Sequence, residues 1–185
     1  MFEYPTHELK VAGLTRHLPI CPVNEHLDIA AFVIFSDVEL TIACAAELLK
    51  KLPDYDVEYD ALLTAESKGI PLAYEMSRQS GKKYILARKG KKLYMRDPVA
   101  VDVKSITTEK VQTLYLDADD MEYLKGKRVL LVDDVVSTGE SMAAMEGLCK
   151  AADGIVVGMA AILAEGDAAD REDLIYLEKL PLFFK

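Results

Sequence analysis

The segment VLLVDDVVSTGES, from Val129 to Ser141, combines residue types that could bind a phosphorylated sugar. Its apolar run predicts a buried strand that ends in two adjacent acids, Asp133 and Asp134. Paired carboxylates can accept hydrogen bonds from a sugar diol. Backbone N–H groups, hydroxyls and the N-terminus of a following helix can bind the phosphate of the same sugar. The residues expected to bind that phosphate are Ser137, Thr138, Gly139, Glu140 and Ser141.

Basic residues are concentrated between Met76 and Arg96, a stretch that contains no Asp or Glu. The whole chain has a formal net charge of -9, so this local excess of positive charge predicts a binding site for a polyanion. The acidic overall charge disfavours nucleic-acid binding, and we expect no nucleic-acid partner. The basic residues of the stretch are Arg78, Lys82, Lys83, Arg88, Lys89, Lys91, Lys92 and Arg96.

Strands and helices are expected to alternate along the chain. Residues 59–64 read as a short buried strand, residues 70–79 as a helix that Gly81 ends, and residues 84–88 as the next strand. This order forms a βαβ unit with parallel strands, and the alternation returns later, which predicts an α/β fold with an open, mainly parallel sheet. The further elements expected are a helix over 37–52, an antiparallel hairpin of 99–106 with 110–117, a strand over 128–132, a helix over 139–152, a strand over 154–163, and a final strand with an apolar tail.

Length and composition set broad limits. A chain of 185 residues with 51% hydrophobic residues can bury one substantial core, and we expect residues 1–185 to form a single domain. Three cysteines without C-x-x-C spacing argue against a disulfide framework and favour a reducing cytoplasm. The N-terminus lacks the features of a signal peptide, and no window reaches the roughly 18 apolar residues of a membrane span, so we expect no membrane association.

The segment from Val129 to Ser141 resembles the 5-phosphoribosyl-1-pyrophosphate (PRPP) motif of type I phosphoribosyltransferases. The resemblance implies that Asp133 and Asp134 hold the ribose 2- and 3-hydroxyls and that residues 137–141 hold the 5-phosphate. It also implies the fold of that family: an open, twisted parallel sheet flanked by helices, with a small N-terminal hood over residues 1–36 and a flexible antiparallel flap over residues 92–116.

A second segment, from Thr64 to Leu93, resembles the corresponding part of adenine and xanthine phosphoribosyltransferases. Adenine enzymes have Arg-Gly where this chain has Lys68-Gly69, so a point charge replaces a flat bidentate contact there. The residues that the resemblance places against pyrophosphate are Ser67, Lys68, Arg88, Lys89 and Lys92.

The resemblance also implies residues that act on the base. The flap of adenine enzymes carries a Glu near the departing group, and here Thr107 aligns with that position while Glu109 lies two residues further on. The segment PVNEHLD resembles the xanthine-type base segment, in which Asn24 matches an amide that contacts the purine. Catalytic roles are therefore expected for Asp133, Asp134, Arg88 and Glu109, and base binding for Asn24.

The implied reaction moves ribose 5-phosphate from PRPP to a purine, giving a nucleoside monophosphate and pyrophosphate in purine salvage. Adenine is favoured because the length and the ARKGKKL segment are similar to those of adenine enzymes. The alternatives are a xanthine or guanine enzyme, an orotate-type enzyme, and a PRPP-sensing regulator without turnover. Mg²⁺ is expected to arrive with PRPP, without dedicated protein ligands, and a homodimer is implied.

Other interpretations of the paired acids fit less well. Two acids after a strand can cap the next helix and do nothing else. An ATPase of the P-loop class requires G-x-x-x-x-G-K-[ST], which this chain lacks. A response-regulator receiver would carry its acids early in the chain, whereas Asp133 and Asp134 come late.

Overall fold

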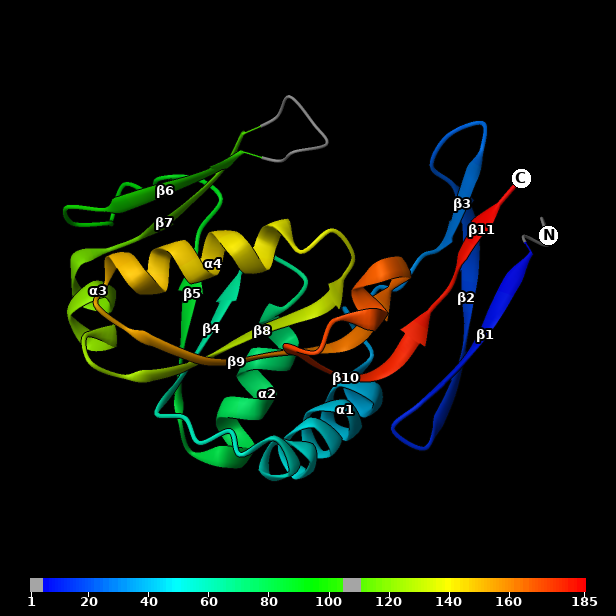
Figure 1. The fold of residues 1–185 in the computed structure, drawn as a ribbon, viewed down its shortest axis with the longest axis horizontal. Coiled ribbons are helices and arrows are strands. Elements are labelled where there is room, and N and C mark those ends of the chain that lie inside the picture. Colours follow the sequence, from blue (N-terminus) through cyan, green and yellow to red (C-terminus); the bar gives the residue numbers. More distant parts are fainter. Residues whose placement is uncertain (1–4, 105–110) are drawn as a thin grey trace.

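The computed structural model describes residues 5–104 and 111–185. Its centre is a parallel sheet of five strands in the order β10-β9-β8-β4-β5 (Figure 1). A smaller antiparallel sheet and a separate hairpin accompany it. The central strands are β4 (Ala61–Ala65), β5 (Lys83–Ala87), β8 (Arg128–Val136), β9 (Ile155–Glu165) and β10 (Leu174–Leu180).

Helices cover both faces of the central sheet, as expected for parallel strands (Figure 1). One face carries α1 (Val38–Lys51) and α2 (Ile70–Ser80), and the other carries α3 (Ala118–Leu124) and α4 (Glu140–Ala151). Short 3-10 turns follow α1 at Leu52–Tyr55 and β9 at Gly166–Asp170. No helix in the described ranges is long and apolar enough to cross a membrane.

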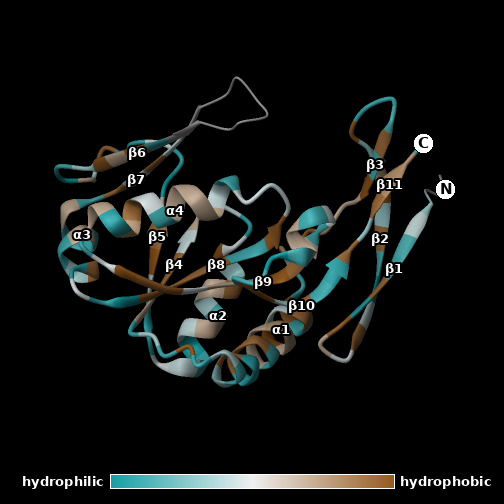
Figure 2. Ribbon diagram, viewed as in Figure 1, coloured by the Kyte–Doolittle hydropathy of each residue, from teal (hydrophilic) through white to brown (hydrophobic). Residues whose placement is uncertain are grey.

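Strand alternation divides the core into two layers. Leu62 and Leu130 pack toward α1 and α2, whereas their neighbours Leu63 and Leu131 pack toward α4. All four side chains are fully buried, and burying a leucine contributes about 1.5–3 kcal/mol each. The hydrophobic colouring of the central strands in Figure 2 follows from this burial on both faces.

The antiparallel sheet, called the hood sheet here, is built from both ends of the chain. Its order is β1-β2-β3-β11, with strands Thr6–Val11, Leu14–Pro22, Leu27–Ala30 and Leu182–Phe184. Residues Ala12 and Gly13 join β1 to β2 with φ of 50° and 75°, the positive values that a two-residue hairpin requires. The apolar C-terminal tail expected from the sequence is corrected to β11, the last strand of this sheet.

The expected hairpin is present. β6 (Val99–Lys104) pairs antiparallel with β7 (Val111–Leu116) and lies over α4 in Figure 1. Leu114 and Leu116 are fully buried in the same core layer as α4. The approach is close, because a Cβ atom at Gly147 of α4 would lie 2.9 Å from Val101 Cγ1.

Two elements differ from the sequence prediction. Helix α3 was not expected, although Asp117 caps it by accepting a hydrogen bond from Asp120 N–H at 3.0 Å. Strand β8 was expected to end at Val132 but continues to Val136, with Asp133 opposite Ala161 of β9. The paired acids therefore lie on a strand rather than in a loop, because the ladder with β9 continues past them.

Asp60 and Arg128 fix the start of β8 beside the start of β4. The carboxylate of Asp60 accepts hydrogen bonds from Arg128 N–H at 3.0 Å, Nε at 3.1 Å and Nη2 at 2.9 Å. These hydrogen bonds hold the pKa of Asp60 below its usual range. A lowered pKa in the folded state contributes stability above the unfolded pKa of about 4, and this contribution is lost as the pH falls.

We expect Asp60→Asn to lower the midpoint of urea unfolding at pH 7, and the difference from the natural chain to shrink below about pH 4. Glu58→Gln is the matched control, because Glu58 also bonds Arg128, at 2.7 Å, but its side chain is 84% exposed. Its midpoint should hardly change. An Asp60→Asn effect that stays constant from pH 3 to pH 7 would contradict this account.

Candidate active site

The predicted site residues converge because the central strands are all parallel. The carboxyl ends of β4, β5, β8 and β9 lie at one edge of the sheet, where ligands of open α/β sheets bind. The loops that follow β4 and β5 carry the predicted pyrophosphate residues, and the end of β8 carries the paired acids and the phosphate loop. Residues from three separate segments therefore form one site.

Asp133 and Asp134 lie at this edge with little to neutralise them. Asp134 is 5% exposed, and its N–H donates to Asp133 Oδ1 at 2.9 Å. Burial raises the pKa of both carboxyls, and the charge of Asp134 raises that of Asp133 further. The nearby positive charges of Lys89 and Lys68 oppose these shifts, at Asp133 and Asp134 respectively.

Two buried oxygens on the strands β4 and β8 have no hydrogen-bond partner among the described residues. They are Thr64 Oγ1 on β4 and Asp134 Oδ2 on β8. Buried polar atoms in native proteins are nearly always hydrogen-bonded, so the Asp134 oxygen, on a residue that also lines a cavity, is suited to accept a hydrogen bond from a ligand hydroxyl. Gly69 permits the arrangement, because a Cβ there would lie 2.4 Å from Thr64 Oγ1 and 3.0 Å from Asp133 Oδ1.

The loop after β8 forms a small hollow of about 40 Å³, lined by Asp133 and residues 135–142. Gly139 is the N-cap of α4, with φ of 79°, and Thr138 Oγ1 accepts a hydrogen bond from Glu140 N–H at 3.5 Å. Residues 139–142 line the hollow, so the N-terminus of α4 can serve as an anion-binding end, as at other phosphate-binding helices. The five predicted phosphate residues, Ser137 to Ser141, all line this hollow.

Arg171 is a cation beside this loop that sequence reasoning missed. A Cβ atom at position 139 would lie 2.6 Å from Arg171 Nη1, so a larger residue would require this guanidinium to shift, and the positive φ itself favours glycine. Asp173 holds the same guanidinium, accepting from Nε at 2.9 Å and from Nη2 at 2.7 Å. Nothing in the local sequence indicates the contact, because Arg171 reaches the loop only through the fold.

Glu66 ties the two basic loops together. Its carboxylate accepts hydrogen bonds from Arg88 Nη1 at 2.7 Å and from Lys89 N–H at 2.8 Å, and Lys92 Nζ lies 4.0 Å away. Burial acts to raise the pKa of Glu66, but these hydrogen bonds and the Lys92 charge outweigh it and hold the pKa below its usual value. Sequence reasoning missed Glu66, although an acid at the end of a predicted strand was a usable signal.

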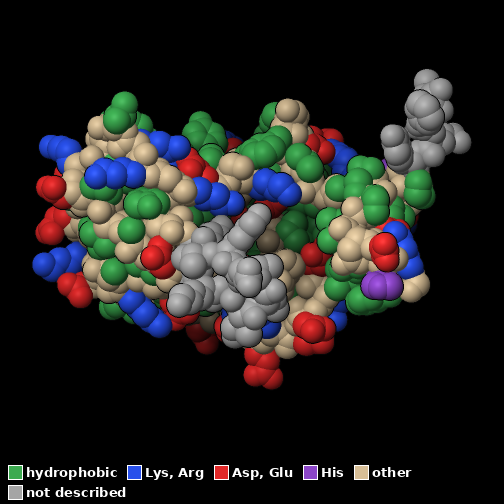
Figure 3. Space-filling model, turned by 90° about the horizontal axis from the view of Figure 1, so that it is seen from above, with side chains coloured by type: hydrophobic (Ala, Val, Ile, Leu, Met, Phe, Trp, Pro, Cys, Tyr) green, Lys and Arg blue, Asp and Glu red, His purple; other side chains and the backbone are tan. Residues whose placement is uncertain are grey.

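The other predicted anion-binding residues are accessible. Ser67, Lys68 and Lys89 are exposed, and the peptide bond between Glu66 and Ser67 is cis. Figure 3, seen toward the carboxyl edge, shows Lys and Arg side chains on the core beside a hollow that separates it from the hood sheet. An anion could therefore reach these groups from solvent.

That hollow contains a cavity of about 260 Å³ between β3 and the carboxyl edge. Its lining is apolar on the hood side, where Ile29 and Phe32 contribute, and carries Lys68, Asp134 and Glu165 on the core side. Pockets of this kind, apolar with a few polar groups, suit a flat organic ligand. Sequence reasoning did not identify Glu165 as a polar group of this cavity.

The predicted base-binding residue Asn24 does not line this cavity. Asn24 is exposed in the turn between β2 and β3, where its side-chain oxygen accepts a hydrogen bond from His26 N–H at 2.8 Å, and it is not among the lining residues. Thr107 and Glu109 lie outside the described residues. The roles expected for Asn24 and Glu109 stay predictions.

A parallel sheet whose carboxyl edge carries two adjacent acids, a small hollow at a helix N-terminus and two basic loops defines an α/β protein with a site suited to a sugar phosphate. A sequence model of the family described as "Phosphoribosyl transferase domain" matches residues 37–179. The chain therefore belongs to the phosphoribosyltransferase family, and the expected type I fold and PRPP-dependent enzyme class are confirmed at that level.

Individual relatives agree with the family. An adenine phosphoribosyltransferase of Bifidobacterium animalis subsp. lactis is 32% identical over 146 residues, which cover 79% of this chain and 73% of the relative. A xanthine phosphoribosyltransferase of an Exiguobacterium species is 31% identical over 121 residues, 65% of this chain and 62% of the relative. The crystal structure of adenine phosphoribosyltransferase from Thermoanaerobacter pseudethanolicus has a TM-score of 0.66 at 21% identity, covering 79% of this chain and 84% of that one.

We expect Gly139→Ala to lower the free energy of unfolding by about 1–3 kcal/mol, because alanine is strained at positive φ and its Cβ would meet Arg171. Urea unfolding measures the change. Gly126→Ala separates the two causes, because Gly126 has φ of 67° but open space around its Cβ position. Gly90→Ala, with open space and no positive φ, should change stability by less than about 0.5 kcal/mol. Equal losses at 139 and 126 would contradict a tight Arg171 contact.

Proposed function

We propose that this protein transfers the 5-phosphoribosyl group of PRPP to a purine base, with adenine favoured, and releases pyrophosphate. One observation supports this most strongly: a buried oxygen of Asp134, which has no hydrogen-bond partner in residues 5–104 and 111–185, lies on the same strand end that leads into the phosphate hollow. The Asp134 carboxylate and the phosphate hollow could therefore bind the hydroxyls and the phosphate of one sugar at the same time. The purine preference rests on relatives named as adenine, xanthine and hypoxanthine/guanine enzymes, which are 30–34% identical, whereas those named as orotate enzymes are 27% identical.

The acidic and the basic side chains of the site act on different parts of PRPP. Asp133 and Asp134 accept hydrogen bonds from the ribose hydroxyls, and their negative charge favours the positive charge that develops on the sugar as pyrophosphate leaves. Residues 137–141 hold the 5-phosphate. On the opposite side, Ser67, Lys68, Lys89 and Lys92 bind pyrophosphate together with Arg88, whose guanidinium Glu66 already positions. Fixed dipoles and charges of this kind lower the barrier without reorganisation.

Mg²⁺ fits this site as part of the substrate. Magnesium prefers oxygen ligands and keeps several waters. The oxygens that the chain offers nearby are the carboxylates of Asp133 and Asp134, and no cluster of three His, Cys, Asp or Glu residues suited to a metal occurs in the described part of the chain. PRPP oxygens and water would complete the shell, and the bound ion would act as a Lewis acid on the leaving group.

The remaining parts of the chain have proposed roles in this reaction. The hood segment, residues 1–36, would wall the base cavity through residues 29–33, and residues 92–116 close over the site as a flap that excludes water. Glu109 and Asn24 are candidates for contact with the purine. We place the whole of residues 1–185 in one functional domain, in a reducing cytoplasm, where the three free cysteines Cys21, Cys44 and Cys149 would persist.

Pyrophosphate release tests the function directly. The natural chain, Mg²⁺ and PRPP are incubated separately with adenine, xanthine, hypoxanthine, guanine and orotate. We expect release with adenine at the highest kcat/KM. A xanthine or guanine preference would replace the favoured base, orotate turnover would contradict a purine enzyme, and PRPP binding without release with any base would support the PRPP-sensing alternative.

The double variant Asp133→Asn, Asp134→Asn tests whether these two acids form the PRPP site. We expect it to lose PRPP binding, measured by calorimetry, because amides offer weaker acceptors to the ribose diol. Its fold should persist. Burial raises the pKa of both acids, so their ionisation opposes folding above the unfolded pKa of about 4, and the variant should unfold at an equal or higher urea concentration at pH 7. Unchanged PRPP affinity would refute the site.

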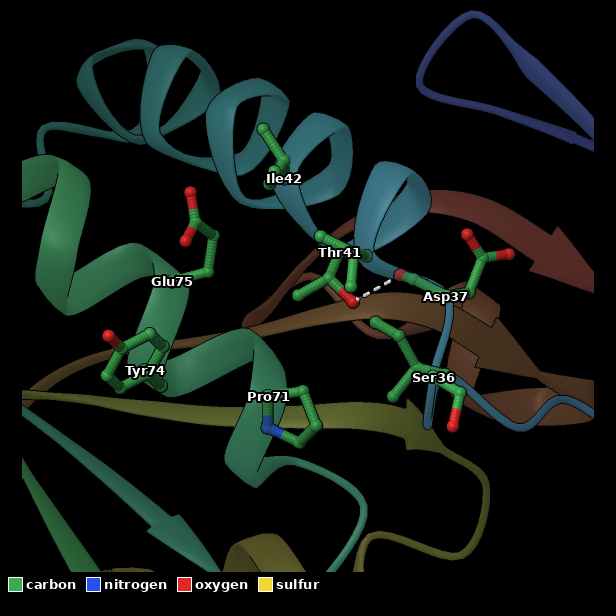
Figure 4. Close-up of a pocket in the computed structure, with 9 residues that line it drawn as sticks. Ser36, Asp37, Thr41, Ile42, Pro71, Tyr74 and Glu75 are labelled. Atoms are coloured by element: carbon green, nitrogen blue, oxygen red, sulfur yellow. Dashed lines mark hydrogen bonds between the residues drawn. The ribbon is translucent and has the colours of Figure 1, made fainter.

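We further propose that two copies associate through the face shared by α1 and α2. Around a pocket of about 220 Å³, shown in Figure 4, this face exposes apolar side chains that a monomer would be expected to bury. Val38 is 68%, Ile42 42% and Tyr74 56% exposed. The N-terminus of α2 follows directly on the loop that carries Lys68, so a partner bound here would also support the anion site.

Ile42→Glu should shift the protein from dimer to monomer, because a charge would be buried at the interface. Light scattering after gel filtration measures the mass. Ile155→Glu is the control, since Ile155 is 55% exposed on β9, away from this face, and should leave the mass unchanged. A monomeric natural chain, or an Ile42→Glu variant that stays dimeric, would contradict the proposal.

A further inference from the structure

Glu165 is a carboxylate in the base cavity for which the reaction described so far gives no role. It ends β9, is half-buried, and lines the cavity together with Phe32, Lys68 and Asp134. It makes no hydrogen bond or ion pair within the described ranges, although the charge of Lys68 acts on it. Burial raises the pKa of Glu165 above its usual value.

The backbone holds Glu165 rigidly. It pairs in register with Leu180 of β10, and the preceding residue, Ala164, pairs with Val136 at the end of β8. The next residue, Gly166, has φ of 58°, and a Cβ there would lie 2.8 Å from Leu182 Cδ1 of the hood sheet. The carboxylate is therefore carried by a strand end that is fixed on both sides, as a specificity group requires.

The polar groups of the cavity differ in what they can recognise. Under the proposed function, Asp134 binds the ribose and Lys68 binds pyrophosphate, which leaves the carboxylate of Glu165 as an acceptor available to the base. An ionised carboxylate only accepts hydrogen bonds. The amino group at C6 of a 6-aminopurine can donate to it, whereas the carbonyl oxygen at C6 of a 6-oxopurine would face it with lone pairs. Discrimination by such repulsion is a general device of specificity.

We infer that Glu165 accepts a hydrogen bond from the exocyclic amino group of a 6-aminopurine and so selects this class of base over 6-oxopurines. The inference rests on the proposed function, because it assumes that the cavity holds the purine. It assigns Glu165 to specificity and not to PRPP binding, since the phosphate hollow is lined by residues 133 and 135–142 and not by Glu165.

The test compares adenine with hypoxanthine and with unsubstituted purine, which lacks any group at C6. For Glu165→Gln, whose amide oxygen is a weaker, uncharged acceptor, we expect kcat/KM for adenine to fall about tenfold, because the charge assistance to the hydrogen bond is lost. The values for purine should change less than about threefold, and KM for PRPP should not change. Glu178→Gln, an exposed acid on β10, is the control and should match the natural chain.

Each alternative outcome is distinct. Equal losses for adenine and purine, or a raised KM for PRPP, would show that Glu165 instead positions Lys68, and would overturn the inference. Higher kcat/KM of the natural chain for hypoxanthine than for adenine would overturn it while phosphoribosyl transfer stands. If the natural chain turns over no base, calorimetric binding of adenine and purine with PRPP and Mg²⁺ gives the same comparison. Absence of purine binding there would overturn both proposals.

Discussion

The structure depends on two carboxylates held at the end of a buried strand without a matching cation in direct contact. A charge in such a place is unfavourable on its own, and burial raises the pKa of both Asp133 and Asp134. The β8 ladder holds them there, because its pairing with β9 continues to Val136 beyond the acids. Functional sites commonly retain groups whose burial is unfavourable, because a bound ligand then provides the hydrogen bonds that the protein does not.

Glu66 reduces the repulsion among the basic side chains that are predicted to bind pyrophosphate. Basic side chains that bind a polyanion repel one another before the anion arrives, and long side chains lose entropy when they are ordered. The Glu66 carboxylate offsets this repulsion by holding Arg88 and the backbone of Lys89, and Tyr94 lies with its ring 5.9 Å from the Arg88 guanidinium. The cations of the second loop are thus partly ordered in advance, while Lys68 and Lys89 keep their charge exposed.

Local sequence predicted the parts of the site that depend on one segment. A few neighbouring residues are enough to indicate the paired acids, the phosphate loop and the end of α2 at Gly81, where φ is 70°. Arg171 beside Gly139 and Glu165 beside Lys68 could not be found this way, because their contacts depend on which strands become neighbours in the sheet. Helix α3 was missed for a different reason: its seven residues are too few for a clear apolar period, although its Asp cap was visible.

The pairing of β11 with β3 joins residues 182–184 to residues 27–29 across nearly the whole length of the chain. During synthesis, the central sheet and the sugar-phosphate end of the site can form as soon as β10 has left the ribosome. The wall opposite the sheet edge gains its last strand only when residue 184 has emerged. A nascent chain would thus have its anion-binding groups in place before the compartment for the organic ring has taken shape.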